Sequence, residues 1–420
     1  MATNTIQQNT FIPAIGALPA GWGCTRVRNL FTEIVDRYDG KKDHFLPLLS
    51  VSEYYGVAER AEKIDEGDIL VRASSLDGYK KCHTGDLVSN IMLTWRGALG
   101  VSPKDGIVSP AYCVYRPING ICGKYYHYLF RTQRYADIFK IHSTGLIDSR
   151  LRLYSAKFFA IKVPFPSLNE QEKIAKFLDE QCEKIDYICK EAQSSICEYK
   201  SWKSSIIYEA VTKGLNPNAE MKDSGIMWIG KIPAHWGIGR VKNCFVNHDE
   251  WREPISAENR ENKLKLYDYY GASGPIDKID FFNVDDTVLL IGEDGANLRM
   301  RNLPLVYKAS GKFWVNNHAH ILKVKEPNSY DFMAYLLEAG DYNEYITGSA
   351  QPKLSQFNLM RYPIPLVPPR EQKEIETYLN RRCSKIDEII EEKKALISDL
   401  ESYKKSLIFE VVTGKRRIIS

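Results

Sequence analysis

The chain has 420 residues, with 57 Lys and Arg against 53 Asp and Glu, so its formal net charge is only +4. This length exceeds what one ordinary hydrophobic core supports and predicts roughly two to four domains. No run of about 18 apolar residues occurs, which argues against a membrane protein. The polar segment Met1–Asn9 lacks the apolar stretch of a signal peptide, so we expect a cytoplasmic protein.

The first half of the chain begins with a short opening motif, Ile15–Trp22, and continues into a long region, about Glu33–Phe158. Apolar runs separated by turn residues predict mixed strands and turns with some helix, including strands at Gly67–Arg72 and Ser109–Tyr115. The region ends in a glycine turn and a polar, basic segment, Thr144–Arg152, which we name closing loop 1.

A long helix is predicted next, over about Leu168–Thr212. Apolar residues recur there at every seventh position with a second, interleaved row, which is typical of a coiled-coil seam. Gly214 follows the helix, as a C-cap glycine does. The main row is Leu178, Ile185, Ala192, Tyr199 and Ile206, and the interleaved row is Ile174, Ile188 and Trp202.

The second half repeats this order. An opening motif, Ile229–Trp236, precedes a region at about Asn247–Met360, with strands expected at Thr287–Gly292 and Asn317–Val324. Closing loop 2, Thr347–Ser355, ends the region. A second helix is predicted over about Pro369–Thr413, starting at a proline and followed by Gly414. Its main row is Leu379, Ile386, Lys393, Leu400 and Leu407, and its interleaved row is Ile389, Leu396 and Tyr403.

The two halves are copies of one unit. Pro164–Thr212 aligns without a gap on Pro365–Thr413, 201 positions later, and roughly two positions in five are identical. The regions between the similar parts diverge, which indicates one scaffold carrying two specificities; neutral drift of two structural halves is the alternative. A pseudo-twofold molecule suits duplex DNA. We expect the helices to pair with each other, antiparallel, although each could instead pack on its own region.

Basic side chains and one glutamine are the candidate DNA contacts. We expect the cations to lie in loops after the first strands of each region and in the closing loops. Arg and Gln can read guanine and adenine edges, and Lys mostly contacts phosphate, but any such residue taken singly is more often a solvated surface charge. The candidates are Lys80, Lys81, Arg150, Arg152, Arg299, Arg301, Lys308, Lys312, Gln351 and Lys353.

Catalytic motifs are missing from the sequence. It contains no P-loop, no GxGxxG after a strand, no HExxH and no Asn/Asp-Pro-Pro-aromatic methyltransferase motif. Glu371–Lys373 fits a loose nuclease pattern but is better interpreted as helix-surface charge, and Glu293–Asp294 could bind a metal but better fits a strand-ending turn. We therefore expect a binding subunit without a cofactor or metal of its own.

The cysteines are interpreted as buried thiols of a reducing compartment rather than disulfides or metal ligands, because the nine residues are irregularly spaced without a CxxC pair. Three of them lie in the first predicted helix: Cys182, Cys189 and Cys197.

Nearly the whole chain resembles the DNA-specificity subunits of type I restriction–modification systems. The resemblance is most specific in Met221–Trp236, in Gly348–Ser355 and in Pro363–Gln372, which leads into the second helix. Closing loop 1 departs from the family pattern, because Leu146–Arg150 lacks the Gln-x-Lys sequence of closing loop 2.

The resemblance implies an α+β fold with two mixed α/β target-recognition domains, residues 1–160 and 216–366. Conserved helices in residues 161–215 and 367–420 would form an antiparallel coiled coil that acts as a spacer. Each domain would read half of a split double-stranded DNA site. Two modification subunits carrying S-adenosylmethionine would dock on the helices, and two motor–nuclease restriction subunits would join. The alternatives are a coiled-coil scaffold that never touches DNA and a self-sufficient DNA enzyme, which the missing motifs disfavour.

Overall fold

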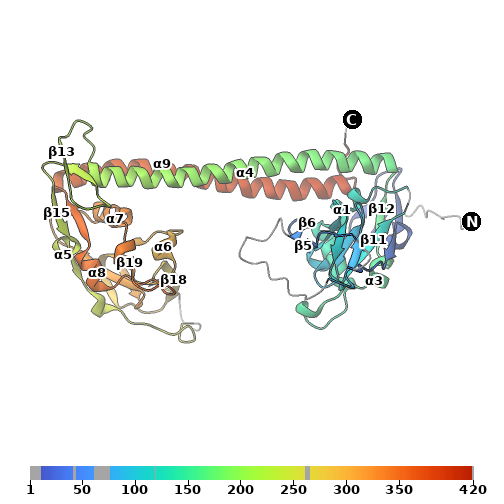
Figure 1. The fold of residues 1–420 in the computed structure, drawn as a ribbon, viewed down its shortest axis with the longest axis horizontal. Helices are drawn as coiled ribbons and strands as arrows, with labels where there is room; N and C mark the ends of the chain where they lie inside the picture. Colours follow the sequence, from blue (N-terminus) through green and yellow to red (C-terminus); the bar gives the residue numbers. More distant parts are fainter. Residues whose placement is uncertain (1–10, 41–43, 61–75, 119, 261–264, 419–420) are drawn as a thin grey trace, which may run out of the picture. The chain divides into compact units, whose positions relative to one another are not determined.

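The computed structural model describes residues 11–40, 44–60, 76–118, 120–260 and 265–418. Two compact units account for the chain: unit 1 is Met1–Ala192 with Ala395–Ser420, and unit 2 is Gln193–Lys394 (Figure 1). Each unit therefore contains one region of strands together with part of both long helices. The predicted strand Gly67–Arg72 lies outside the described residues.

The order of elements repeats between the halves (Figure 1). The first half contains β1 (Phe11–Ile12), β2 (Gly16–Ala17), β3 (Gly23–Arg26), β4 (Phe31–Ile34), β5 (Leu49–Ser52), β6 (Gly56–Glu59), β7 (Lys80–Cys82), β8 (Leu87–Asn90), β9 (Leu99–Val101), β10 (Gly106–Val108), β11 (Tyr112–Pro117), α1 (Gly123–Phe130), α2 (Gln133–His142), α3 (Ser155–Ala160), β12 (Lys162–Phe165) and α4 (Leu168–Lys213). The second half contains β13 (Met221–Asp223), β14 (Lys231–Pro233), β15 (Gly237–Arg240), α5 (Val241–Cys244), β16 (Phe245–Asn247), β17 (Tyr267–Gly271), β18 (Gly274–Ile279), β19 (Val284–Gly292), α6 (Asn297–Met300), β20 (Val306–Val315), β21 (Ala319–Val324), α7 (Tyr330–Ala339), α8 (Gln356–Arg361), β22 (Pro363–Leu366) and α9 (Pro369–Val412).

The main sheets of the two units share a topology. In unit 1 the strand order is β4-β11-β8-β9, and in unit 2 it is β16-β21-β19-β20, extended by β17 and β18. In each unit a further pair, β3 with β12 or β15 with β22, joins the start of the region to its end. The strands predicted at Ser109–Tyr115 and Asn317–Val324 are confirmed as β11 and β21, and Thr287–Gly292 lies within β19.

The counterpart of β19 in unit 1 is β8, because β8 pairs with β11 as β19 pairs with β21. The strand β8 is short, fully buried and contains the polar residues Ser89 and Asn90, so it was not predicted from the sequence. Burial on both faces removes the alternation by which a strand is usually recognised.

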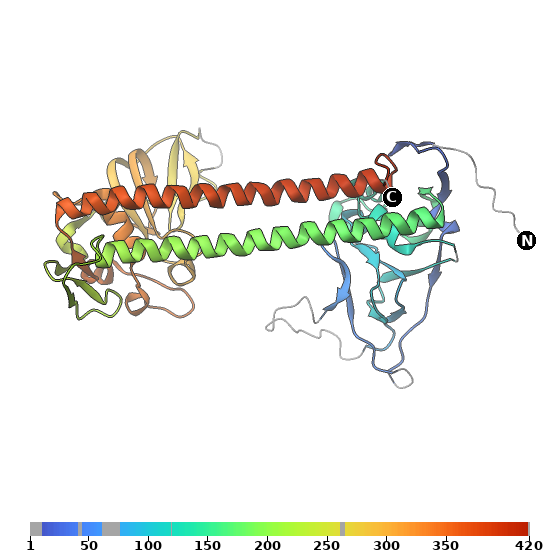
Figure 2. The ribbon, with the colours of Figure 1, turned by 90° about the horizontal axis from the view of Figure 1, so that it is seen from above.

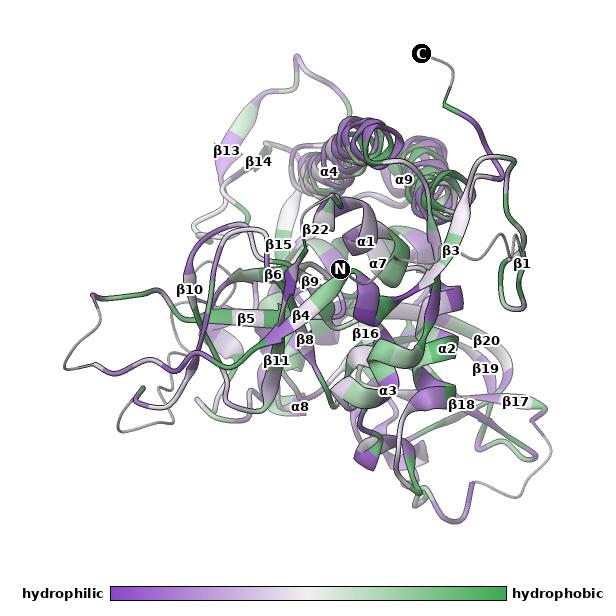
Figure 3. Ribbon diagram, turned by 90° about the vertical axis from the view of Figure 1, so that its right-hand side faces the viewer, coloured by the Kyte–Doolittle hydropathy of each residue, from purple (hydrophilic) through white to green (hydrophobic). Residues whose placement is uncertain are grey.

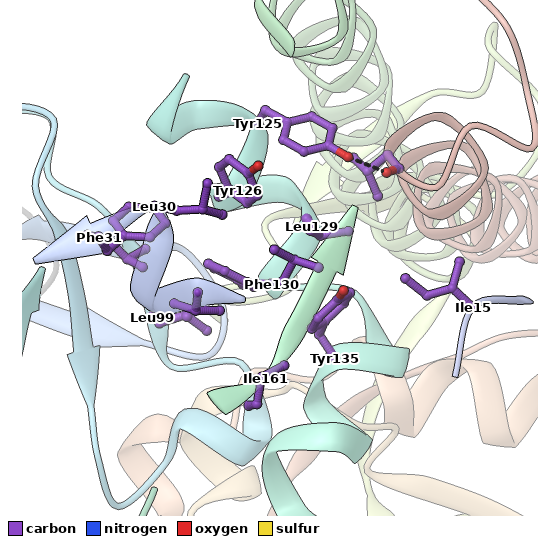
Figure 4. Packing of buried hydrophobic residues seen from close by; sticks show 14 of the residues in the cluster. Ile15, Leu30, Phe31, Leu99, Tyr125, Tyr126, Leu129, Phe130, Tyr135 and Ile161 are labelled. Atoms are coloured by element: carbon purple, nitrogen blue, oxygen red, sulfur yellow. Dashed lines mark hydrogen bonds between the residues drawn. The ribbon is translucent and has the colours of Figure 1, made fainter. Parts of the chain in front are cut away.

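The core of unit 1 is built from aromatic side chains of α1 and α2. Tyr125, Tyr126 and Phe130 of α1 pack with Tyr135 of α2 (Figure 4). The Tyr125 hydroxyl donates a 2.7 Å hydrogen bond to the carbonyl of Val412, at the end of α9. The same core thus takes in the end of the second long helix, which fixes that helix to unit 1.

Equivalent glutamines make the same buried contacts in both units. Gln171 accepts a hydrogen bond from the backbone N–H of Cys122 at 2.9 Å, and Gln372 accepts one from Ser329 at 3.0 Å. Each amide also donates 2.8 Å to a carbonyl five residues earlier in the chain. These paired contacts hold α1 and α7 against the starts of α4 and α9, so the sequence repeat is also a structural repeat.

The two long helices pack against each other within each unit (Figure 2). In unit 1 the Asp186 carboxylate lies 2.6 Å from the Lys404 ammonium, and in unit 2 Asp387 lies 2.6 Å from Lys203. The two ion pairs are the same pair of positions, shifted by 201 residues. The predicted pairing is confirmed, and so are the predicted α+β fold class with two long helices and the glycines in left-handed conformation past their ends, Gly214 and Gly414.

The predicted interleaved rows are wrong by one position, except at Ile174, which is buried as expected. Ile188 and Trp202 are 45% and 46% exposed, and Leu396 and Tyr403 are also exposed. The row that faces the partner helix, here called the inner row, lies one position further along each helix. It includes small residues and the charged Lys203 and Lys404, so the larger apolar side chains beside it were predicted instead. Both helices carry apolar residues among polar ones (Figure 3). The buried members of the inner row are Ala175, Cys182, Ile196, Ala210, Glu376, Cys383, Ile390 and Val411.

The cysteine interpretation holds for most positions, since the nine thiols are free and most are buried. Cys197, however, is exposed on α4, so the prediction of three buried helix thiols is wrong there. Among the described residues no helix is long and apolar enough to cross a membrane.

Candidate nucleic-acid interface

Closing loop 2 is attached to the end of strand β19. The N–H of Leu354 donates to the carbonyl of Glu293 at 2.8 Å, and Gly295 donates to Pro352 at 3.1 Å. Thr347 and Lys353 pair across the loop. Helix α6 follows Gly295 directly, so the loop and α6 lie together at one edge of the sheet.

Two candidates at this edge have side chains without a partner. Arg299 on α6 and Gln351 in closing loop 2 are exposed, and neither forms a hydrogen bond or ion pair through its side chain with any residue that the structure describes. Arg can bind guanine with two hydrogen bonds, and Gln can bind adenine in the same way. The edge therefore presents two side chains of the kind that read base edges.

A buried carboxylate holds the third candidate at this edge. Glu293 pairs with the Lys353 ammonium at 2.9 Å and with the guanidinium of Arg252. Burial alone would raise the pKa of Glu293, but the hydrogen bonds from Lys353 and Arg252 outweigh it and hold that pKa below its usual range. Lys353 is therefore held by its ammonium group while its side chain remains half exposed, as a phosphate anchor of fixed position would be.

A buried histidine secures the backbone of closing loop 2. The His320 ring contacts the Asp249 carboxylate at 2.6 Å through Nδ1 and the Leu354 carbonyl at 2.7 Å through Nε2. Both partner atoms are oxygens that accept hydrogen bonds, and each lies within hydrogen-bond distance of one ring nitrogen. Burial would raise the pKa of Asp249, but His320, the Ile321 N–H and Arg252 lower it overall. Closing loop 2 thus packs on a hydrogen-bonded network that includes charged side chains.

The remaining cations of unit 2 lie elsewhere. The prediction that they occupy a loop is wrong, because Lys308 and Lys312 belong to strand β20. Lys308 pairs with Asp331 of α7 at 2.6 Å, and the Lys312 ammonium lies 4.6 Å from the Phe282 ring centre. A glycine and a serine between these lysines, in an exposed stretch of the strand, resembled a loop in sequence.

Arg301 has a structural role. It adopts a left-handed conformation with a φ of 53°, which is uncommon for a residue other than glycine. Its guanidinium donates to the Glu338 carbonyl at the end of α7 and lies 3.8 Å from the Glu338 carboxylate. These contacts connect α6 to α7, so the side chain is engaged within the unit.

Closing loop 1 is attached in the same way in unit 1. Thr144 pairs with Arg152, and the N–H of Leu153 donates to the carbonyl of Ile91 at 2.9 Å, just past β8. Ile91 thus takes the place of Glu293. Arg150 is exposed, and the Arg152 guanidinium donates to the Arg150 carbonyl at 3.3 Å.

The two lysines predicted in a loop of unit 1 belong to strand β7. The Lys80 ammonium donates to the Tyr112 carbonyl at 2.5 Å, and Lys81 pairs with Asp36 at 3.2 Å. Tyr112 pairs with Asn90 at the end of β8, which places Lys80 near the edge that carries closing loop 1.

The acidic residues considered for a metal site or a nuclease pattern have structural roles. Asp294 pairs with His318 at 2.8 Å, and Glu293 with its two cations. Glu371 accepts a 3.0 Å hydrogen bond from the Trp236 indole, which joins the second opening motif to α9. Within the described ranges, no cluster of three or more His, Cys, Asp or Glu side chains could hold a metal ion.

Sequence reasoning missed the network beneath closing loop 2. Its members, Asp249, Arg252, Glu293 and His320, are far apart in sequence and meet only through strand pairing. The available signal was His320 within an otherwise apolar strand, because a buried polar group requires a partner.

Comparison with known proteins gives one consistent family. The family model described as the type I restriction modification DNA specificity domain matches residues 58–193 and 251–399. The type I restriction enzyme MjaVIII specificity subunit of Methanocaldococcus jannaschii is 24% identical over 454 aligned residues, which cover 96% of this chain and 94% of that protein. A proposed type I specificity subunit of Haemophilus influenzae is 33% identical over 107 residues, 26% of this chain and only 27% of that protein.

Two solved structures share the fold. One, from work on complex assembly and conformational transition of the type I R-M system, has a TM-score of 0.70 at 13% identity and covers 95% of this chain and 99% of its own. The HsdS subunit from Thermoanaerobacter tengcongensis has a TM-score of 0.53 at 14% identity, with 95% and 98% covered.

Proposed function

The chain belongs to the type I restriction modification DNA specificity family, and from that membership we propose that it reads a bipartite, asymmetric DNA sequence, one half with each unit. The observation that carries the proposal is the pair of closing loops. They are attached to equivalent strands, β8 and β19, by equivalent hydrogen bonds, yet they present different side chains. One frame with two different reading edges suits a site whose halves differ.

The chain contributes specificity and no catalysis in this proposal. S-adenosylmethionine and methyl transfer belong to two modification subunits, and two restriction subunits supply the motor and nuclease. A scaffold that never touches DNA is the competing function. A gel-shift assay with and without modification subunits, on the methylated sequence and on random DNA, separates the two. Methyl transfer by the purified chain alone would contradict the non-catalytic assignment.

We propose that the exposed apolar side chains of α4 and α9 dock the modification subunits. The exposed Ile188 and Tyr403 lie in unit 1, and the half-buried Ile389 and the exposed Trp202 take the equivalent positions in unit 2. Large apolar side chains on a solvated helix face mark an interaction surface. Two equivalent patches suit two copies of one partner.

Removing the two exposed aromatic rings should prevent assembly. We expect Trp202→Ala and Tyr403→Ala each to weaken binding of a modification subunit by roughly 30-fold, the effect of losing about 2 kcal/mol at an aromatic hot spot. The double variant should remain free of both subunits in analytical ultracentrifugation. Met227→Ala, which removes an exposed side chain just before the second opening motif, is the matched control. Full assembly of the double variant would rule out this surface.

Residues proposed to contact bases and those proposed to contact phosphates, at the edge of unit 2, should respond differently to mutation. Arg299→Ala and Gln351→Ala should weaken binding to the correct site by about 1–3 kcal/mol and binding to random DNA far less. Lys353→Ala should weaken both and lower the salt slope by about one. Lys308→Ala, on strand β20 and outside closing loop 2, is the matched control. Fluorescence anisotropy titrations at several salt concentrations measure all four; equal losses on every sequence would leave only nonspecific charge contacts.

A further inference from the structure

Closing loop 1 displays large apolar side chains in water. Leu146 is 101% exposed and Ile147 is 55% exposed. In closing loop 2 the residues that follow the corresponding glycine are Ser349 and Ala350. An apolar pair at a loop tip contributes nothing to the core of unit 1, so its exposure points to a partner outside the chain.

The loop holds this tip in place. Its ends are joined by two backbone hydrogen bonds between Thr144 and Arg152, of 2.9 and 3.0 Å. A single turn of 3-10 helix, Asp148–Arg150, follows the tip, and Asp148 pairs with Lys140 of α2 at 2.8 Å. A Cβ atom at Gly145 would lie 2.6 Å from the Arg150 carbonyl oxygen, so the tight turn requires glycine. Leu146 and Ile147 are therefore presented by a closed, braced loop.

Exposed and partly exposed cations follow the apolar tip in the chain. Arg150 and Lys157 are exposed nearby in the chain, and Arg152 is partly exposed. The acid of the loop, Asp148, is paired with Lys140. An apolar tip framed by cations matches a polyanion with an apolar interior, which describes the phosphates and stacked bases of duplex DNA. DNA-binding proteins insert Leu and Ile side chains between base pairs and neutralise the flanking phosphates with cations.

We propose that Leu146 and Ile147 form a wedge that inserts between adjacent base pairs of the first half-site. The inference rests on the proposed function, because it needs unit 1 to meet DNA through closing loop 1. The two units then read by different means: unit 2 through the base edges met by Arg299 and Gln351, and unit 1 in part through the ease with which a base step opens. Pyrimidine–purine steps unstack most easily, so the first half-site should contain one at the wedge.

The test uses the full chain assembled with its modification subunits. Methylation mapping first identifies the site, and 2-aminopurine is then placed at each step of the first half-site except at the methylated adenine, whose own extrusion would raise the signal. We expect binding to increase fluorescence several-fold at one step. The double change Leu146→Ser with Ile147→Ser should abolish the increase and weaken binding on the order of tenfold, the cost of losing the inserted contact. Leu146→Met should retain the increase, because Met also serves as a wedge.

The controls separate the possible causes. Ile141→Ser removes an 80% exposed side chain of α2 outside the loop and should leave fluorescence and affinity unchanged. An unaltered signal in the double variant would overturn the wedge while leaving sequence-specific binding intact. Loss of a modification subunit from the double variant would also overturn it and identify the tip as a protein contact. If the native complex shows no preference for the mapped site over random DNA, the proposed function itself fails, and the wedge fails with it.

Discussion

Replacing residues 33–158 with the corresponding region of another family member should change one half of the methylated DNA sequence and leave the other half unaltered. The exchanged region contains β8 and closing loop 1, whereas the DNA contacts proposed for unit 2 lie in a separate set of residues. Because recognition would reside in each unit by itself, the new half-site should be that of the donor. Genome-wide mapping of methylated positions measures both halves at once.

The structure indicates which donor regions will fit. Gln171 binds a backbone N–H, at Cys122, so any donor sequence can supply that contact. The hydroxyl of Tyr125 binds the end of α9, so the donor should have tyrosine there. A reciprocal exchange of residues 247–360 is the matched control and should change only the other half. Simultaneous change of both halves in either chimaera would contradict the two-reader proposal.

The long helices were predictable because their signals are local. A seven-residue apolar repeat, a starting proline and glycines past the ends placed α4 and α9 to within one residue at each boundary. The repeat in sequence also predicted the repeated frame. Whether Ile188 or Cys189 faces the partner helix depends on the angle at which the helices meet, and two neighbouring rows in the sequence could not decide it.

The candidate reading edges were only partly predictable. Gln351 and Arg299 were chosen by residue type, and the structure brings them to one edge because closing loop 2 pairs with the residues just past β19. Lys308 was chosen on the same ground and lies on a strand, paired with α7. Residue type indicates what a side chain can bind, but only tertiary pairing indicates which charges are already engaged. The apolar tip, Leu146 and Ile147, was a departure from the expected loop pattern that a search for charge alone passes over.

Inserting seven helix-forming residues into both long helices should lengthen the unspecified gap between the half-sites by about three base pairs, since seven residues add about 10.5 Å and DNA rises about 3.4 Å per pair. The join after α4 is unsuitable as an insertion point. Ala210, Val211 and Thr212 are buried in unit 2, so an insertion there would disrupt its core. The boundaries between the units offer a better place.

Those boundaries fall at Ala192–Gln193 and at Lys394–Ala395, where Gln193 and Lys394 are exposed and lie 201 positions apart. A whole heptad at each keeps the seam in register. Three base pairs also turn DNA by roughly 100°, at about 10–10.5 pairs per turn, so affinity should fall even as the gap lengthens. Three heptads in each helix add about 31.5 Å, close to one full turn, and should recover much of the lost affinity.

Methylation mapping of the lengthened variants decides whether the helices measure DNA. Both half-site sequences should persist while the gap grows. Seven residues inserted in α4 alone form the mismatched control: they would shift the partners of Lys203 and Asp186 by two helical turns, so assembly should be lost. Ile188→Pro should break α4 and likewise prevent assembly, because proline removes a helix hydrogen bond and clashes with the preceding turn. An unchanged gap with methylation intact in the doubly lengthened variants would mean that the helices serve as packing surfaces and that the spacing is set elsewhere.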